Sequence, residues 1–152
     1  MKHAIIVIIL SFGLFAVAQE SPVVWETDIK KAVDVSIEQK KPLFLFFTGS
    51  DWCGVCVKLQ KEVFAYPQFQ DWAKKNVVLV ELDFPRNKQP DPVLQEQNTP
   101  MKEMFGITGY PTIVFVNPAK NALGTYYTRI GSLGYKAGGP DVWLEAANQI
   151  LP

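Results

Sequence analysis

The chain has few of the side chains on which most metal and acid–base sites depend. It contains one histidine and two cysteines, and the histidine, His3, lies in the amino-terminal segment that we expect to be cleaved. Without a histidine, the mature chain lacks Cys–His and Ser–His catalytic pairs and every imidazole metal ligand. Two thiols alone do not complete an ordinary four-ligand zinc site within one chain. We therefore predict a mechanism that uses no metal and no cofactor.

The chain also has no excess of charge of either sign. It carries 15 Lys+Arg and 15 Asp+Glu, and loss of Lys2 with the leader leaves 14 basic against 15 acidic side chains. Binding to nucleic acid or to an anionic membrane surface requires a strongly basic face, so we expect neither partner. A composition with 48% hydrophobic and 20% charged residues is typical of an ordinary globular domain.

Residues 1–18 have the pattern of a secretory signal peptide. Lys2 gives a positive start, residues 5–17 form an almost unbroken apolar run, and Ala16-Val17-Ala18 offers the small-x-small pattern of a cleavage site. The apolar run is shorter than the roughly 20 residues of a membrane-spanning helix. We expect cleavage after Ala18, a periplasmic or secreted mature chain from about Gln19, and no stable membrane anchor.

Residues 19–152 suit one domain with a single core. Apolar spacing predicts a helix over 29–37 capped by Thr27, with Ile37 on its inner side, and another from Cys53 whose stripe includes Leu59 and Val63. Further helices are expected over 68–75, where Phe69 and Trp72 are buried, and at the carboxyl end, where Val142, Leu144, Ala147 and Leu151 line the inner side. Trp25 and Trp143 are expected to pack in the core.

Continuous apolar runs at 43–47, 77–83 and 113–116 predict strands that are buried on both faces. A turn at 117–121 and a partner strand at 123–130, ended by Gly131, predict an antiparallel hairpin. The alternation of helices and strands indicates an α/β fold with a central mixed sheet flanked by helices.

Residues 84–100 differ in character because four prolines interrupt a polar stretch. Proline within an element removes a backbone donor, so we predict an insertion loop with short helical turns at 91–97 and 101–105. The loop is either a surface insertion or a segment that recognises a partner.

Cys53-Gly54-Val55-Cys56 follows a buried strand and opens a helix. This spacing sets two thiols one helical turn apart, with the unpaired N–H groups of the helix start facing Cys53. That geometry favours a thiolate at Cys53 and leaves Cys56 in reach to close a disulfide. The pattern predicts thiol–disulfide redox chemistry; the alternative is a structural disulfide that staples a turn.

Two motifs in this order resemble the thioredoxin superfamily: Trp-Cys-Gly-x-Cys after a buried strand, and Gly-Tyr-Pro-Thr at 109–112 before another. The chain is similar to exported bacterial thioredoxin-like proteins that carry Gly-Ser-Asp-Trp-Cys-Gly-x-Cys followed by Lys-Glu-Val-Phe, here residues 49–56 and 61–64. The resemblance extends over about residues 25–151 and includes a closing hairpin and a last helix.

This resemblance implies a thioredoxin-like fold and a protein thiol–disulfide oxidoreductase. It implies that Cys53 is the attacking thiolate, that Cys56 is the resolving thiol, and that Pro111 follows a cis peptide bond and lies against the pair. An extended substrate would bind the backbone of Tyr110 by strand addition, with Trp52 as an apolar contact. The implied partners are proteins with cysteines or disulfides, and a membrane or small-thiol electron donor.

The chain departs from thioredoxins proper at two places. A buried Asp and a neighbouring Lys assist proton transfer in that group, and counting places Phe47 and Leu79 there. Glu81, expected on the face of Leu79, is a candidate replacement; the alternative is a solvated strand-end side chain. Val55, beside Gly54, tunes the potential together with its neighbours, and we expect a reducing or isomerising enzyme.

A second hypothesis is a thioredoxin-fold binding or adaptor module with a non-catalytic or regulatory cysteine pair. In that case the loop at 84–100 would dock a client. Under either hypothesis Asp51, Lys58 and Lys61 are expected to form a solvated rim.

Overall fold

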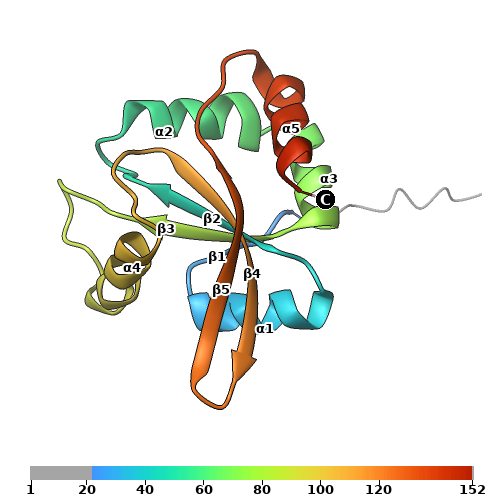
Figure 1. The fold of residues 1–152 in the computed structure, drawn as a ribbon. Helices are drawn as coiled ribbons and strands as arrows, with labels where there is room; N and C mark the ends of the chain where they lie inside the picture. Colours follow the sequence, from blue (N-terminus) through green and yellow to red (C-terminus); the bar gives the residue numbers. More distant parts are fainter. Residues whose placement is uncertain (1–21, 152) are drawn as a thin grey trace, which may run out of the picture.

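The computed structural model describes residues 22–151, so the predicted signal segment lies outside the described residues. A five-stranded sheet with the order β1-β3-β2-β4-β5 forms the centre of the molecule (Figure 1). Its strands are β1 (Trp25–Glu26), β2 (Leu43–Thr48), β3 (Val78–Asp83), β4 (Thr112–Asn121) and β5 (Gly124–Leu133). Strand β3 is parallel to β1 and β2, whereas β4 is antiparallel to β2 and β5. The predicted mixed sheet is confirmed.

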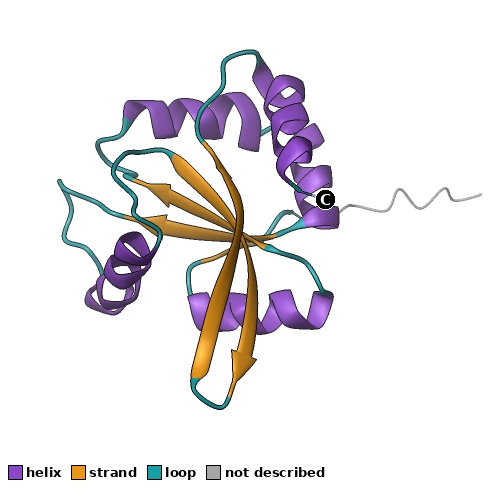
Figure 2. Ribbon diagram, in the orientation of Figure 1, coloured by secondary structure: helices purple, strands orange, loops and turns teal. Residues whose placement is uncertain are grey.

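Helices cover both faces of this sheet. They are α1 (Ile29–Gln39), α2 (Gly54–Leu59), α3 (Pro67–Asn76), α4 (Pro92–Met104) and α5 (Gly139–Ile150), and a π-helical segment, η1 (Gln60–Phe64), continues α2. Figure 2 shows α2, α3 and α5 on one side of the sheet and α1 and α4 on the other. The α/β class with helices on both faces is therefore as predicted.

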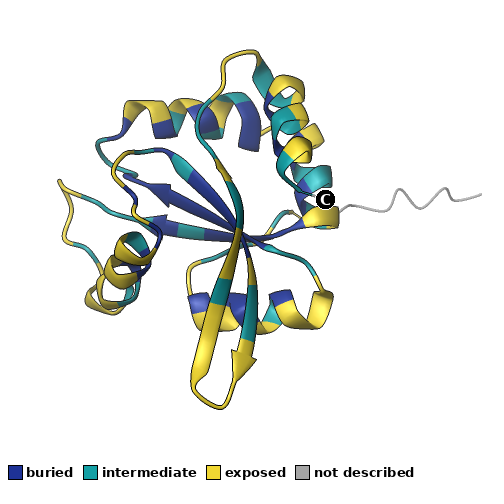
Figure 3. Cartoon of the chain, viewed as in Figure 1, coloured by how far each residue is buried: buried dark blue, intermediate teal, exposed yellow. Residues whose placement is uncertain are grey.

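Alternation along β2 divides the core into two clusters. All residues of β2 are buried, and its strand is dark blue in Figure 3. Phe44 and Phe46 pack with the cysteines and Trp143 under α2, α3 and α5. The intervening side chains pack toward α1 and α4 in a separate cluster; they are Leu43, Leu45 and Phe47. This burial on both faces explains the unbroken apolar sequence of β2.

The amino-terminal cap and the inner face of α1 differ from the prediction. Asp28 is the N-cap, because its carboxylate accepts hydrogen bonds from the backbone N–H groups of Lys30 and Lys31. Ser36 is buried, and its hydroxyl donates to the Lys41 carbonyl, whereas Ile37 is 43% exposed. Burial of a small hydrogen-bonded side chain lets the helix approach the sheet, a feature that an apolar periodicity does not reveal. The two-residue strand β1 was also not predicted.

Helix α4 is longer and more regular than the proline content predicts. It runs continuously over the residues assigned to two short turns, with Asp91 as the N-cap, Pro92 in the first turn and Pro100 inside. A proline is compatible with the first helical turn, where no N–H partner is lost. Its buried side holds Asn98 and Met101. The irregular loop is thus limited to residues 84–91.

The β4–β5 hairpin is also longer than predicted. Strand β4 continues through the expected turn to Asn121, and β5 continues past Gly131 to Leu133. Pairing shifts register between Phe115 and Val116, which face Gly131 and Arg129. Glycine in a strand often marks such a bulge, so Gly131 bends the strand without ending it.

The inner faces of α3 and α5 are carried by different side chains from those expected. In α5, Trp143 and Ala147 are buried, whereas Val142 is exposed and Leu144 is half-buried. In α3, Phe69 is buried as predicted, but Trp72 is only half-buried. The phase of α5 follows Trp143 because burial of this large side chain outweighs that of Val142.

Candidate active site

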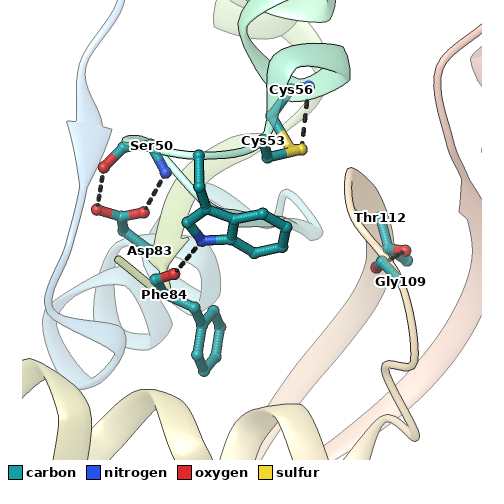
Figure 4. The surroundings of a disulfide bond; sticks show 8 residues. Ser50, Cys53, Cys56, Asp83, Phe84, Gly109 and Thr112 are labelled. Carbon is teal, nitrogen blue, oxygen red and sulfur yellow. Dashed lines mark hydrogen bonds between the residues drawn. A yellow bond between two sulfur atoms is a disulfide. The ribbon is translucent and has the colours of Figure 1, made fainter. Parts of the chain in front are cut away.

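The two cysteines lie at the start of α2, where they form a disulfide with an S–S distance of 2.06 Å (Figure 4). Cys53 is the N-cap, and its Sγ accepts a hydrogen bond from the backbone N–H of Cys56 at 3.2 Å. The exposed fraction is 6% for Cys53 and 0% for Cys56. The prediction that Cys56 reaches Cys53 is confirmed, and Cys53 is the less buried of the two residues.

The loop that carries the cysteines is fixed to the end of β3. Ser50 donates its backbone N–H and its hydroxyl to the two carboxylate oxygens of Asp83, at 2.8 and 2.6 Å (Figure 4). The backbone N–H of Cys53 donates to the carbonyl of Gly49 at 2.9 Å. A Cβ on Gly49 would lie 2.4 Å from the Trp52 indole, so the indole occupies the space that any side chain at position 49 needs.

Asp51 connects the cysteine loop to the loop at 84–91. Its carboxylate accepts hydrogen bonds from the backbone N–H groups of Arg86, Asn87 and Lys88, at 3.0, 2.7 and 2.9 Å. The Asn87 side chain returns a hydrogen bond to the Asp51 carbonyl at 2.9 Å. Desolvation acts to raise the pKa of Asp51, but the three backbone donors hold it below its ordinary value. Asp51 remains partly exposed, as expected for a rim residue, and its carboxylate also holds the loop at 84–91.

Aromatic side chains from three segments meet beside the disulfide. The Trp52 indole N–H donates to the Phe84 carbonyl at 2.8 Å. The Tyr110 ring lies 5.5 Å from the Trp52 ring, edge to face, and 5.6 Å from the Phe84 ring. The Arg86 guanidinium stacks 3.5 Å above the Trp52 ring. Trp52 and Tyr110, both predicted as site residues, are thus brought together.

The peptide bond between Tyr110 and Pro111 is cis, as the resemblance implied. Pro111 is buried, and the Thr112 hydroxyl donates to the Gly109 carbonyl at 2.8 Å across this turn. Thr112 pairs with Phe47 on β2. The cis bond therefore lies beside the end of β2, where the cysteine loop leaves the sheet.

The positions assigned to the buried acid and base of thioredoxins do not face each other. Phe47 packs in the cluster toward α1, whereas Leu79 packs in the cluster that contains the cysteines. Glu81 shares the face of Leu79 and pairs in register with Phe46. Successive side chains of a strand point to opposite faces, which confirms the predicted face of Glu81.

Glu81 is half-buried, with part of its side chain exposed to solvent. Burial, and then the nearby Asp83 carboxylate, raise the pKa of Glu81, while Lys88 acts in the opposite direction. It lines a pocket of about 350 Å³ with apolar and polar neighbours, which are Trp25, Phe46, Ser50, Gln60, Phe64 and Ala65. The only buried side-chain polar atom without a hydrogen-bond partner in the described residues is the hydroxyl oxygen of Thr48, on the neighbouring strand.

The two residues between the cysteines have different exposures and constraints. A Cβ on Gly54 would meet no atom within 4 Å, so packing does not require glycine there. Val55 is 47% exposed next to the disulfide. Its side chain is therefore part of the surface next to the disulfide.

Among residues 22–151, no cluster of three or more His, Cys, Asp or Glu side chains is arranged to hold a metal ion. None of the helices in this part of the chain has the length and apolar character that a membrane span requires.

Sequence comparison decides the family. Residues 29–128 match the thioredoxin-like domain. The chain belongs to this family. This thioredoxin-like chain is 34% identical over 128 residues to the disulfide bond reductase DsbH of Chlamydia pneumoniae, over 84% of this chain and 72% of DsbH. It is 31% identical over 116 residues to the thioredoxin-related protein DsbJ of Chlamydia pneumoniae, of which it spans 32%.

A solved structure described as DsbH oxidoreductase has the same fold. Its TM-score to the thioredoxin-like chain is 0.73 with 29% sequence identity, over 86% of this chain and 85% of that one. Together with the cysteine pair at disulfide distance, these relatives show that the chain is a thiol–disulfide oxidoreductase.

Sequence reasoning missed the residues that hold the two loops together, which are Gly49, Ser50, Asp83 and Arg86. The hydrogen bonds of Ser50 with Asp83 and of Arg86 with Asp51 join positions 33 and 35 residues apart, and the constraint on Gly49 comes from the Trp52 indole, which lies against it. The parallel pairing of β2 with β3 creates these contacts. No local spacing in the sequence signals them.

Proposed function

We propose that the chain reduces disulfide bonds of exported proteins, with Cys53 as the attacking thiolate. The observation that carries this proposal is the difference in exposure between the two cysteines, since Cys56 is fully buried and Cys53 is not. Cys53 is therefore the cysteine that a substrate disulfide meets first. The similarity to a relative described as a disulfide bond reductase supports the direction. The signal-like residues 1–18 support export to the periplasm or beyond.

The reaction is a pair of thiol–disulfide exchanges. The Cys53 thiolate attacks one sulfur of the substrate disulfide, a Cys53–substrate bond forms, and the other substrate sulfur leaves as a thiolate that takes up a proton. Cys56 then loses its proton and attacks Cys53, which releases the second substrate thiol and forms the Cys53–Cys56 disulfide. The substrate gains two electrons and the enzyme loses two. A small thiol or a membrane donor returns them.

Backbone groups of the site stabilise the reactive sulfur and bind the substrate. The Cys56 N–H that donates to Cys53 Sγ stabilises negative charge on that sulfur. An extended substrate segment binds along the Tyr110 backbone by strand addition beside Pro111. Trp52 offers an apolar contact to the same segment.

Glu81 serves as the proton acceptor during the resolving step. Its carboxylate lies on the sheet face that carries Cys56, beside a pocket that also includes Ser50 and Gln60. The raised pKa of Glu81 brings its basicity closer to that of a thiol, which favours proton exchange near neutral pH.

Trapping distinguishes this function from that of a binding module. In export-competent cells, the Cys56→Ser variant should accumulate mixed disulfides with clients through Cys53, visible as bands that disappear on reduction. The Cys53→Ser variant should form none and should lose disulfide reduction to background. Full biological activity of the Cys53→Ser, Cys56→Ser double variant would instead favour an adaptor whose cysteines are not catalytic.

The reduction potential of the Cys53–Cys56 couple tests the direction. We expect a value near that of thioredoxin, about −270 mV, when the protein is equilibrated in defined thiol buffers and its free thiols are counted. A value of about −180 mV or higher is typical of isomerases and oxidants. Such a value would contradict a reductase and favour disulfide shuffling or formation.

A further inference from the structure

Two cations flank the aromatic surface next to Cys53. We define the cationic–aromatic rim as Trp52, Phe84, Tyr110, Arg86 and Lys102. Arg86 stacks over Trp52, and the Lys102 Nζ lies 5.6 Å from the centre of the Phe84 ring and 5.7 Å from that of Tyr110. The rings contact one another in the order Trp52, Tyr110, Phe84. The two cations thus lie at the two ends of one continuous surface.

These two cations have no acidic partner. No carboxylate in residues 22–151 forms an ion pair with Arg86 or Lys102, whereas Lys88 pairs with Asp83 at 3.4 Å. The nearby carboxylates are already engaged: Asp51 accepts from three backbone N–H groups, and Asp83 accepts from Ser50. In the described residues neither cation of the rim is held in an ion pair, so both can meet an anionic group of a substrate.

The backbone holds Arg86 in this place. The loop at 84–91 is fixed at Phe84 by the Trp52 indole and at residues 86–88 by Asp51. A cation over an aromatic face is attracted to it and loses little side-chain freedom on meeting an anion. The geometry thus provides a preorganised site for negative charge directly beside the attacking sulfur.

We propose that the cationic–aromatic rim makes the enzyme prefer substrate disulfides that are flanked by acidic side chains in an extended segment. This inference rests on the proposed reductase function and specifies its substrate class. A segment that binds along Tyr110 places the side chains next to its cysteine over Trp52 and Phe84. Aspartate or glutamate at those positions meets Arg86 and Lys102, while lysine or arginine is repelled.

The test uses three peptides of equal length, each with one internal disulfide, flanked by acidic, by neutral polar or by basic residues. In single turnovers at low salt, the pre-reduced chain should reduce the acidic peptide with a second-order rate constant about threefold to tenfold larger than that for the neutral one, and the basic peptide more slowly than both. At about 1 M salt, where the Debye length is about 3 Å, these ratios should approach one.

Variants identify the rim as the origin of the preference. The Arg86→Gln, Lys102→Gln double variant should lose the acidic-to-neutral ratio, and the Arg86→Glu, Lys102→Glu double variant should invert it. The control is Lys30→Gln, which removes one exposed positive charge on α1 that does not belong to the rim. It should keep the wild-type ratio.

Two failures are distinguishable. Equal rates for the three peptides at low salt, or a preference that the charge-reversed variant does not change, would overturn the rim proposal and leave the reductase intact. Absence of reduction of every peptide by the dithiol form would instead overturn the proposed function itself.

Discussion

At the scale of single residues, the site combines a reactive sulfur with polar groups that the fold holds in an apolar surrounding. Glu81 is the clearest case, because it is a half-buried acid between Leu79 and Asp83 on one face of β3. Burial, and then the Asp83 carboxylate, disfavour its charged form and raise its pKa. Such a group costs stability when ionised, and it lies on the sheet face that packs against the cluster with the cysteines.

The pH dependence of stability should reveal the raised pKa of Glu81. An acid whose pKa is higher in the folded state contributes most at pH values below its unfolded pKa, about 4.3, and this contribution is lost as pH rises through its folded pKa. The free energy of unfolding of the wild type, minus that of Glu81→Gln, should therefore fall as pH rises above about 4.3. Urea unfolding of the oxidised wild type and of oxidised Glu81→Gln over a series of pH values measures this difference in free energy. A difference that is constant with pH, or that rises, would contradict the assignment.

At the scale of elements, the cysteine loop and the loop at 84–91 behave as one unit. Each end of α4 and each strand end is set by its own cap or pairing, but these two loops depend on Asp51, Trp52 and Asp83 for their shape. Hydrogen bonds that a charged carboxylate accepts are stronger than those between neutral groups. The carboxylate of Asp51 thus determines where Arg86 lies.

Replacement of Asp51 by Ala should release the loop at 84–91 while the sheet stays intact. The backbone amides of Arg86, Asn87 and Lys88 should exchange hydrogen several-fold faster, because each loses its acceptor. Amide exchange followed by NMR measures this, and Asp51→Asn, which keeps one acceptor oxygen, should give an intermediate effect. Unchanged exchange at these three amides in Asp51→Ala would show that other contacts hold the loop.

At the scale of the whole molecule, an aromatic cluster joins the carboxyl-terminal helix to the sheet. Trp143 contacts the rings of Phe44, Phe64 and Phe69 at 5.9 Å each, and its indole N–H donates to the Gly134 carbonyl at 3.0 Å. The cysteines belong to the same cluster. The packing of α5 therefore supports the layer on which α2 and the active site rest.

Truncation of Trp143 should destabilise the whole domain. Trp143→Ala removes a side chain with 0% exposure, and the resulting cavity should lower the free energy of unfolding by about 3–5 kcal/mol. Leu123→Ala, in a hairpin turn where the side chain is 97% exposed, is the control and should change it by less than about 0.5 kcal/mol. Chemical denaturation measures both. A loss below about 1 kcal/mol for Trp143→Ala would mean that α5 is not part of the cooperative core.

The sequence by itself determined the chemistry and the fold class. A Cys-x-x-Cys pair between a buried strand and a helix is a local pattern, and no histidine is present to offer another mechanism. A local pattern can be recognised in the sequence without knowledge of the tertiary structure. The buried strand β2 was predicted for the same reason, whereas the cis bond before Pro111 was implied by the resemblance to the thioredoxin superfamily. The tertiary structure alone decided where the elements end. Ser36 is buried in place of Ile37, α4 continues through Pro100, and β5 extends past Gly131. In each case packing or strand pairing outweighs the intrinsic propensity of a single residue. The tertiary structure also decided the surroundings of the cysteines. Asp51, Asp83 and Arg86 reach the site only because the parallel pairing of β2 and β3 brings two distant loops to the same edge of the sheet.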